Sequence, residues 1–177
     1  MFAKKLFILI SGHAGVGKST LAEILYNIYK DRGANVEVSP LAKKLKEIAY
    51  DGGWDCVKDE KGRKLLVDIG RVFREYDIDT WVKFAINRPS DVVIIDDWRY
   101  PNELAFIKKN PNYSVVEVRV VCKERETLKG EAYMDDSETS LDSYNVQTEI
   151  HNTGDMYSLW KSAEALEVHI DRKFKKW

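Results

Sequence analysis

The apolar and polar positions of this chain follow two patterns, one typical of strands and one typical of helices. Segments with these two patterns alternate along the sequence. Apolar runs with little polar interruption indicate buried strands, and spacings of three and four residues indicate helices that bury one face. The strand pattern fits residues 6–11, 35–39, 92–95, 113–121 and 148–152. The helix pattern fits residues 18–31, 40–50, 65–73, a segment from 79 onward, and 156–174. This alternation predicts a three-layer α/β fold, with a mostly parallel five-stranded sheet and helices on both faces.

Length and charge narrow the class of protein. A chain of 177 residues is most simply one domain, spanning 1–177. The 28 Lys and Arg nearly balance the 29 Asp and Glu, so no overall basic field is available to hold a long nucleic acid. The N-terminal apolar run ends at residue 10, and no apolar stretch approaches the roughly 20 residues of a membrane span. We therefore expect a cytoplasmic protein that does not enter a membrane.

The most informative motif lies between the first strand and the first helix. Residues 12–19 read Gly-His-Ala-Gly-Val-Gly-Lys-Ser, a full match to the phosphate-binding loop (P-loop) pattern G-x-x-x-x-G-K-[ST]. Glycines allow successive backbone N–H groups to surround a phosphate, and the helix that follows directs its positive end at the same point. Lys18 is then expected to reach the phosphates and Ser19 to bind Mg²⁺. The alternative is a glycine-rich turn without a ligand.

A pair of acidic residues follows the second clear apolar strand. Asp96 and Asp97 come directly after Val92-Val93-Ile94-Ile95, and a carboxylate at this strand end lies beside the P-loop and holds Mg²⁺ directly or through water. Neighbouring residues of a strand point to opposite faces, so register decides which of the two faces the metal. The alternative is an acidic turn that only ends the strand. Trp98 stands beside this pair and is a candidate for contact with the substrate.

Three arginines are candidates for binding a transferred or accepting phosphate. Arg71 and Arg74 are three residues apart and share one face of a helix. Arg99 follows the acidic pair by two residues. Phosphoryl transfer spreads negative charge over several oxygens, so positive groups are needed around them. We interpret Arg119 and Lys129 as solvated surface cations.

A highly charged segment follows the fourth strand. Residues 123–145 have little apolar periodicity, and a loop of this length in a compact domain is usually functional or disordered. A closing lid would suit an enzyme that must exclude water from ATP. A solvated insertion fits the composition equally well.

Four stretches together resemble the phage-type deoxynucleoside monophosphate kinases, within the larger P-loop nucleoside monophosphate kinase group. The P-loop, Gly12 to Thr20, is common to the wider group. Residues 66–74 and 77–82 are similar to the family's helix pair on the acceptor side. Asp97-Trp98-Arg99-Tyr100-Pro101-Asn102-Glu103 resembles its aspartate-x-arginine-x-x-asparagine-glutamate element and is the most specific stretch. Ser137-Glu138 and residues 150–154 resemble its late segment.

The resemblance implies a P-loop kinase fold that phosphorylates a (deoxy)nucleoside monophosphate to the diphosphate with ATP and Mg²⁺. It implies catalytic roles for Lys18, Arg74, Arg99 and Asp97, and Mg²⁺ ligation by Ser19 and Asp97. ATP would contact Gly12, His13, Ala14, Gly15, Val16, Gly17, Lys18, Ser19, Thr20, Arg125 and Asn152. The acceptor would contact Arg71, Arg74, Trp98 and Arg99, and the acceptor-binding helices would lie within about residues 40–90.

Two other functions and the oligomeric state stay open at this point. A kinase of the same class acting on a small alcohol, or on a hydroxylated base in DNA, would need a base, for which Asp96 or Asp97 is the candidate. A nucleotide-binding switch would bind ATP without turnover. A homodimer is compatible with the sequence.

Overall fold

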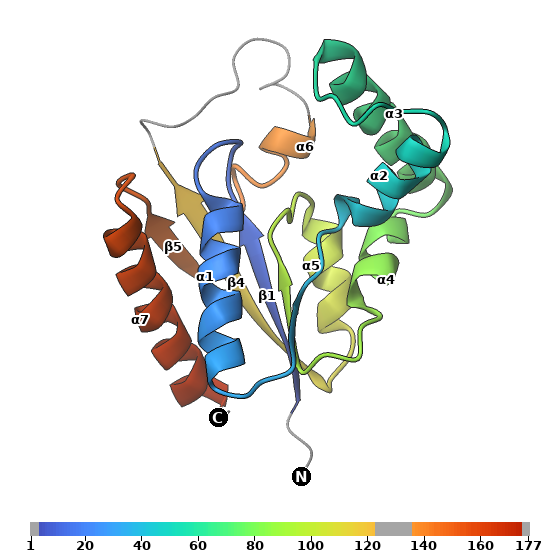
Figure 1. Cartoon of the computed structure of the whole chain (residues 1–177). Coiled ribbons are helices and arrows are strands. Elements are labelled where there is room, and N and C mark those ends of the chain that lie inside the picture. Colours follow the sequence, from blue (N-terminus) through green and yellow to red (C-terminus); the bar gives the residue numbers. More distant parts are fainter. Residues whose placement is uncertain (1–3, 123–135, 175–177) are drawn as a thin grey trace.

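The computed structural model describes residues 4–122 and 136–174, which form a parallel sheet surrounded by helices (Figure 1). The strands are β1 (Lys5–Ser11), β2 (Val36–Val38), β3 (Val92–Ile95), β4 (Tyr113–Val121) and β5 (Thr148–His151). The helices are α1 (Lys18–Asp31), α2 (Ala42–Asp51), α3 (Glu60–Tyr76), α4 (Thr80–Ile86), α5 (Pro101–Lys108), α6 (Asp136–Thr139) and α7 (Met156–Phe174). The strand order is β2-β3-β1-β4-β5, and every pairing is parallel. The predicted five-stranded α/β fold is confirmed.

The sheet separates two hydrophobic cores. Leu6, Ile8 and Ile10 of β1 pack with residues of α1 and α7, which lie side by side on one face (Figure 1). Phe7 and Leu9 point the other way and pack with residues of α2, α4 and α5. Because β1 is buried on both faces, its sequence is a continuous apolar run.

Some local structure differs from the sequence-based expectation. Helix α3 begins at Glu60, before the helix pattern that the sequence shows from residue 65, because Asp59 caps it by accepting a hydrogen bond from the Gly62 N–H at 2.8 Å. The helices α5 and α6 were not predicted. They have eight and four residues, which is too short for a clear helical period in the sequence. Residues 123–135 of the expected lid lie outside the described residues. Within the described ranges, no helix is both long enough and apolar enough to cross a membrane.

Candidate functional site

The P-loop joins β1 to α1 and packs closely against the ends of β4 and β5. Gly12 and Gly17 have φ angles of 135° and 103°, which favour glycine. A Cβ on Gly12 would lie 2.3 Å from the Val120 carbonyl oxygen, and one on Gly17 would lie 2.5 Å from Asn152 Nδ2. Both positions therefore exclude a side chain by conformation and by space.

The ammonium group of Lys18 folds over the P-loop. Its Nζ donates hydrogen bonds to the carbonyl oxygens of Gly12 at 2.7 Å and His13 at 2.8 Å. Burial, together with the nearby Arg99 guanidinium, lowers the Lys18 pKa to about 8, while Glu138 and Asp96 act in the opposite direction. An anion bound at this point would favour the charged form of Lys18.

A hydroxyl and a carboxylate meet at the start of α1. Ser19 Oγ donates a hydrogen bond to Asp96 Oδ2 at 2.7 Å. The second oxygen, Asp96 Oδ1, is buried and has no hydrogen-bond partner among the described residues. Hydroxyl and carboxylate oxygens are the ligands that Mg²⁺ prefers, and an unpaired buried carboxylate oxygen is costly unless a cation or donor satisfies it. Ser19 and Asp96 therefore fit a Mg²⁺ ion.

Asp97 has a different environment from its neighbour. Its two carboxylate oxygens accept hydrogen bonds from the backbone N–H groups of Leu41 at 2.7 Å and Ala42 at 3.0 Å, and so cap α2. Burial raises the pKa of Asp97. The choice of Asp97 as the carboxylate beside Ser19 is wrong, because β3 ends at Ile95 and the turn that follows does not keep the alternation of a strand.

Arg99 is held by the short helix α6, which lies within the expected lid. One terminal nitrogen of its guanidinium lies 2.6 Å from Glu138 Oε1 and donates to the Ser137 carbonyl oxygen at 3.1 Å. The side chain of Glu138 is 10% exposed, and its Oε2 is buried without a hydrogen-bond partner in the described part of the chain. Glu138 is a site residue that sequence reasoning did not single out, although it lies in the late segment of the family resemblance.

A buried glutamate fixes the backbone around Arg99. Glu103 Oε2 accepts hydrogen bonds from the N–H groups of Arg99 and Tyr100, both at 3.0 Å. Burial raises the Glu103 pKa to about 7, although these two hydrogen bonds act to lower it. The guanidinium of Arg74, from α3, lies over the Tyr100 ring at 4.5 Å from its centroid, a favourable cation–π geometry. The segment from Arg99 to Glu103 therefore positions Arg99 through its backbone and Arg74 through the Tyr100 ring.

Two expected substrate contacts, Arg71 and Trp98, have other partners in the structure. The side chain of Arg71 is 60% exposed and pairs with Asp68 at 3.2 Å and Glu75 at 3.5 Å on its own helix. Trp98 is 1% exposed, in the core, and its indole N–H donates to the Tyr100 carbonyl oxygen at 2.8 Å. Trp98 nevertheless lines the cavity beside the P-loop, and both assignments to the acceptor stay predictions. Arg125 lies outside the described residues.

Asn152 supports the P-loop from the end of β5. Its side-chain Nδ2 donates to the Val16 carbonyl oxygen at 2.8 Å, and its Oδ1 accepts from the Gly154 N–H at 2.9 Å. The side chain is buried, so it shapes the P-loop. Its contact with adenine stays a prediction.

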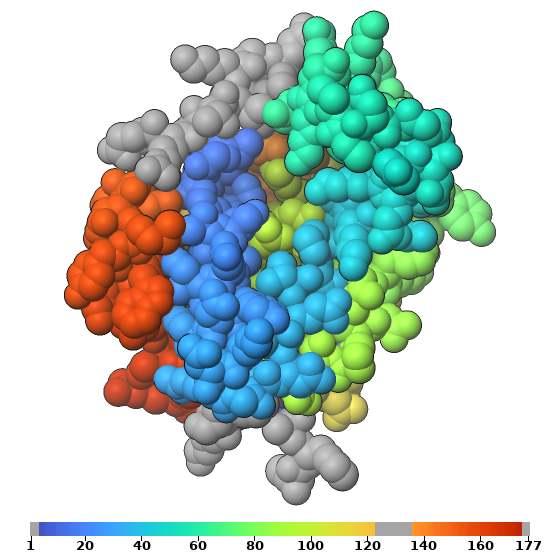
Figure 2. Space-filling model, viewed as in Figure 1, coloured from blue at the N-terminus to red at the C-terminus, as the bar shows by residue number. Residues whose placement is uncertain are grey.

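The P-loop opens onto two hollows. A cavity of about 440 Å³ lies between it and α6, with Gly12, His13, Arg99 and Glu138 among its lining residues. Figure 2 shows a second hollow, which lies between α1 and the α2–α3 pair. The atoms at the floor of this hollow have the colour of the segment that follows β3. Lys46 of α2, which sequence reasoning missed, is close enough to lower the pKa of Asp97. These hollows give ligands access to the residues around Lys18.

Comparison with solved structures gives the class of fold. The chain is similar to a shikimate kinase from Acinetobacter baumannii in complex with shikimate, with a TM-score of 0.55, 13% identity, and coverage of 98% of this chain and 96% of that one. It is similar to Mycobacterium tuberculosis APS kinase in complex with AMPPNP and APS, with a TM-score of 0.53, 13% identity, and coverage of 96% and 99%. A putative kinase from Chloroflexus aurantiacus has a TM-score of 0.52 at 14% identity, covering 97% and 99%.

These likenesses, at low identity, establish the fold and not the reaction. The chain has the P-loop kinase fold, with the phosphate-binding loop in its expected place between β1 and α1. No family model matches the sequence, and a search of curated proteins found no match.

Proposed function

We propose that this protein transfers a phosphoryl group from ATP to a (deoxy)nucleoside monophosphate, forming the diphosphate. The observation that carries the proposal is the turn from Asp96 to Glu103. It places the Asp96 carboxylate on Ser19 and the Arg99 guanidinium near Lys18, and its Tyr100 ring supports Arg74. The resemblance to phage-type deoxynucleoside monophosphate kinases supports the same acceptor.

Each of these residues has a role in the proposed reaction. The P-loop amides and Lys18 bind the phosphates of ATP and stabilise the charge that develops on them. Ser19 and Asp96 would hold Mg²⁺, which neutralises charge on the phosphate oxygens when bound. Arg74 and Arg99 bind the acceptor phosphate, whose oxygen is already a nucleophile at neutral pH and needs no base.

Binding of the acceptor involves an exchange of partners at Arg99. Without acceptor, the guanidinium is paired with Glu138. A phosphate dianion offers two oxygens to a guanidinium and forms the stronger bidentate pair. We propose that the acceptor phosphate replaces Glu138 on Arg99.

A hydroxyl-bearing acceptor is the second candidate, and one observation favours it. Glu138 Oε2 is buried and accepts no hydrogen bond from residues 4–122 or 136–174, and Glu138 acts on the pKa of Lys18 in the P-loop. A carboxylate in that place could accept the proton of an attacking hydroxyl. The APS kinase and shikimate kinase with the same fold are named for other acceptors than a nucleoside monophosphate.

An acceptor panel separates the two functions. Formation of ADP from ATP is measured with each common nucleoside and deoxynucleoside monophosphate, with small alcohols and with DNA that contains hydroxylated bases. We expect turnover with at least one monophosphate, and Arg99→Lys should raise its KM while Arg71→Lys, the matched control on the exposed side of α3, should not. Turnover with an alcohol alone, abolished in Glu138→Gln, would replace the first proposal with the second.

A further inference from the structure

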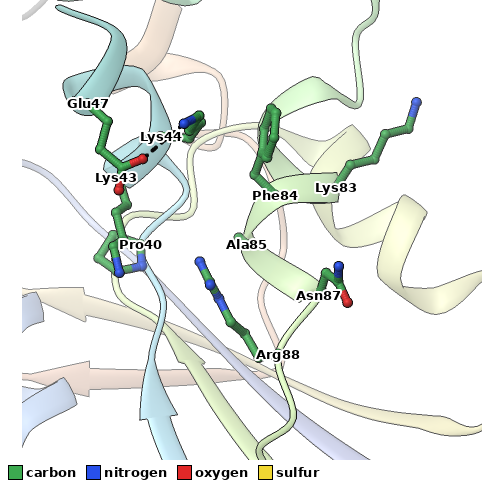
Figure 3. Close-up of a pocket in the computed structure, with 9 residues that line it drawn as sticks. All are labelled: Pro40, Lys43, Lys44, Glu47, Lys83, Phe84, Ala85, Asn87 and Arg88. Carbon is green, nitrogen blue, oxygen red and sulfur yellow. Dashed lines mark hydrogen bonds and ion pairs between the residues drawn. The ribbon is translucent and has the colours of Figure 1, made fainter. Parts of the chain in front are cut away.

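A second cavity, lined mainly by basic residues, lies at the edge of the sheet, between the start of α2 and the end of α4 (Figure 3). Its volume is about 300 Å³. It is lined by Pro40, Lys43, Lys44, Glu47, Lys83, Phe84, Ala85, Asn87 and Arg88. None of these residues lines the cavity beside the P-loop. We call it the α2–α4 cavity.

The α2–α4 cavity is strongly positive for a protein of this composition. Its lining has four cationic residues and one carboxylate, Glu47, whereas the whole chain has a net charge of −1. Lys43 and Lys44 lie in the first turn of α2, which contains no acidic residue. The helix macrodipole is positive at that end, so it adds to the charge of the two lysines.

The ion pairs around the cavity neutralise only part of the positive charge of its lining residues. Lys44 pairs with Glu47 at 3.2 Å, but both side chains are more than 40% exposed, and such pairs contribute little. Lys43 has no ion pair or side-chain hydrogen bond to any described residue. Lys83 pairs with Asp77 and points away from the other lining residues (Figure 3). Lys43 and Lys44 are therefore the lysines that a bound anion can recruit at low cost.

Arg88 is anchored at one point and extends through the middle of the cavity. Its Nε donates to Ser39 Oγ at 2.9 Å and lies 3.5 Å from Glu37 Oε1. Beyond that anchor the guanidinium reaches between Pro40 and Ala85 (Figure 3). A guanidinium that is fixed through Nε keeps its terminal N–H groups in a defined direction, and this geometry suits two oxygens of a phosphate.

An exposed aromatic ring completes the cavity. Phe84 is 47% exposed and stands above the guanidinium of Arg88 as drawn in Figure 3. Nucleobases stack on such rings with little regard to sequence, and about 300 Å³ is the lower end of the size range of small-ligand sites. We propose that the α2–α4 cavity binds a free mononucleotide, with its phosphate on Arg88, Lys43 and Lys44 and its base against Phe84.

This site is separate from the proposed acceptor site. The amides of Leu41 and Ala42 bind Asp97, and Lys46 acts on the same carboxylate, so this side of α2 faces the P-loop. Lys43, Lys44 and Glu47 line the cavity instead. The inference does not depend on which acceptor the protein phosphorylates.

Equilibrium binding to the full-length protein tests the site. AMP and inorganic phosphate are titrated into protein saturated with ADP and Mg²⁺, and the affected residues are located by backbone NMR shifts. AMP should shift the signals of Phe84 and Asn87, and Lys43→Glu should weaken that binding about tenfold or more. Lys161→Glu, an exposed lysine of α7 paired with Glu164, is the control and should leave it unchanged.

Three results would overturn the proposal. The first is equal AMP affinity in the parent protein and in correctly folded Lys43→Glu. The second is binding that is lost in Arg99→Lys and kept in Lys43→Glu, which would place AMP at the acceptor site alone. The third is an affinity for inorganic phosphate equal to that for AMP, which would exclude a role for the base. Arg88→Gln is a second variant: if it folds as the parent protein does, as its melting temperature shows, an unchanged AMP affinity counts as the first result.

Discussion

Glu103→Gln should change how the stability of this protein depends on pH. Glu103 is buried, accepts hydrogen bonds from the N–H groups of Arg99 and Tyr100, and has a pKa raised to about 7 from an ordinary value of 4.5. In the unfolded chain the carboxyl group loses its proton near the ordinary value. At pH values between these two pKa values, the Glu103 carboxyl group is therefore protonated in the folded protein and ionised in the unfolded chain.

The sign of the effect follows from this difference in bound protons. Stability falls with rising pH wherever the folded state binds more protons, so the contribution of Glu103 is fully present below pH 4.5 and is lost as the pH rises through about 7. Linkage between those two pKa values gives a loss on the order of 2 to 3 kcal/mol from pH 5 to pH 8. Glutamine keeps an oxygen that can accept the same hydrogen bonds, but it has no proton to lose.

Denaturant unfolding followed by tryptophan fluorescence measures this contribution. The free energy of unfolding of the parent protein, minus that of Glu103→Gln, should fall by roughly 2 to 3 kcal/mol between pH 5 and pH 8. Glu60→Gln, an exposed acid in the first turn of α3, is the control and should give no such trend. A parent and a Glu103→Gln variant with parallel pH profiles would refute the argument, whatever their absolute stabilities.

Three further predictions concern catalysis. Lys18→Ala should lower turnover about a hundredfold or more while the melting temperature changes little, because Lys18 stabilises charge on the phosphates; similar turnover in both proteins would contradict the P-loop assignment. Asp96→Asn should lower turnover more than Asp97→Asn, whereas Asp97→Asn should lower the melting temperature more, since Asp97 caps α2; the reverse order in both assays would refute the positions assigned to the two carboxylates. Arg74→Lys should raise the acceptor KM about tenfold and leave the ATP KM unchanged, with Arg71→Lys as control; equal effects of the two variants would contradict a special role for Arg74.

The sheet and the P-loop could be predicted from the sequence because both depend on local patterns. Strands buried on both faces read as apolar runs, and β1 and β3 have such runs. The motif from Gly12 to Ser19 needs only a strand before it and a helix after it, and both are present. Helix α5 was missed, although Pro101 at its start and Glu103 two residues later are the residues that favour a first helical turn.

The partners of the candidate site residues depend on contacts that local patterns do not encode. Asp96 and Asp97 are adjacent in a turn, and only the positions of Ser19 and of the α2 N-terminus give them different partners. Arg71 and Arg74 share a helical spacing, but Tyr100 lies against only one of them. The pair of Arg99 with Glu138 joins residues 39 positions apart, and neither residue type indicates the other.

The contact of Asn152 with Val16 has a consequence for how the protein is made. The P-loop motif is complete within the first twenty residues, yet the Val16 carbonyl oxygen receives its hydrogen bond from a side chain 136 positions later. A ribosome must therefore release β5 from its exit tunnel before the loop gains this support. During synthesis, nucleotide binding should appear late and rather abruptly, and chains stalled before residue 152 should bind ATP weakly even though they already contain every residue of the motif.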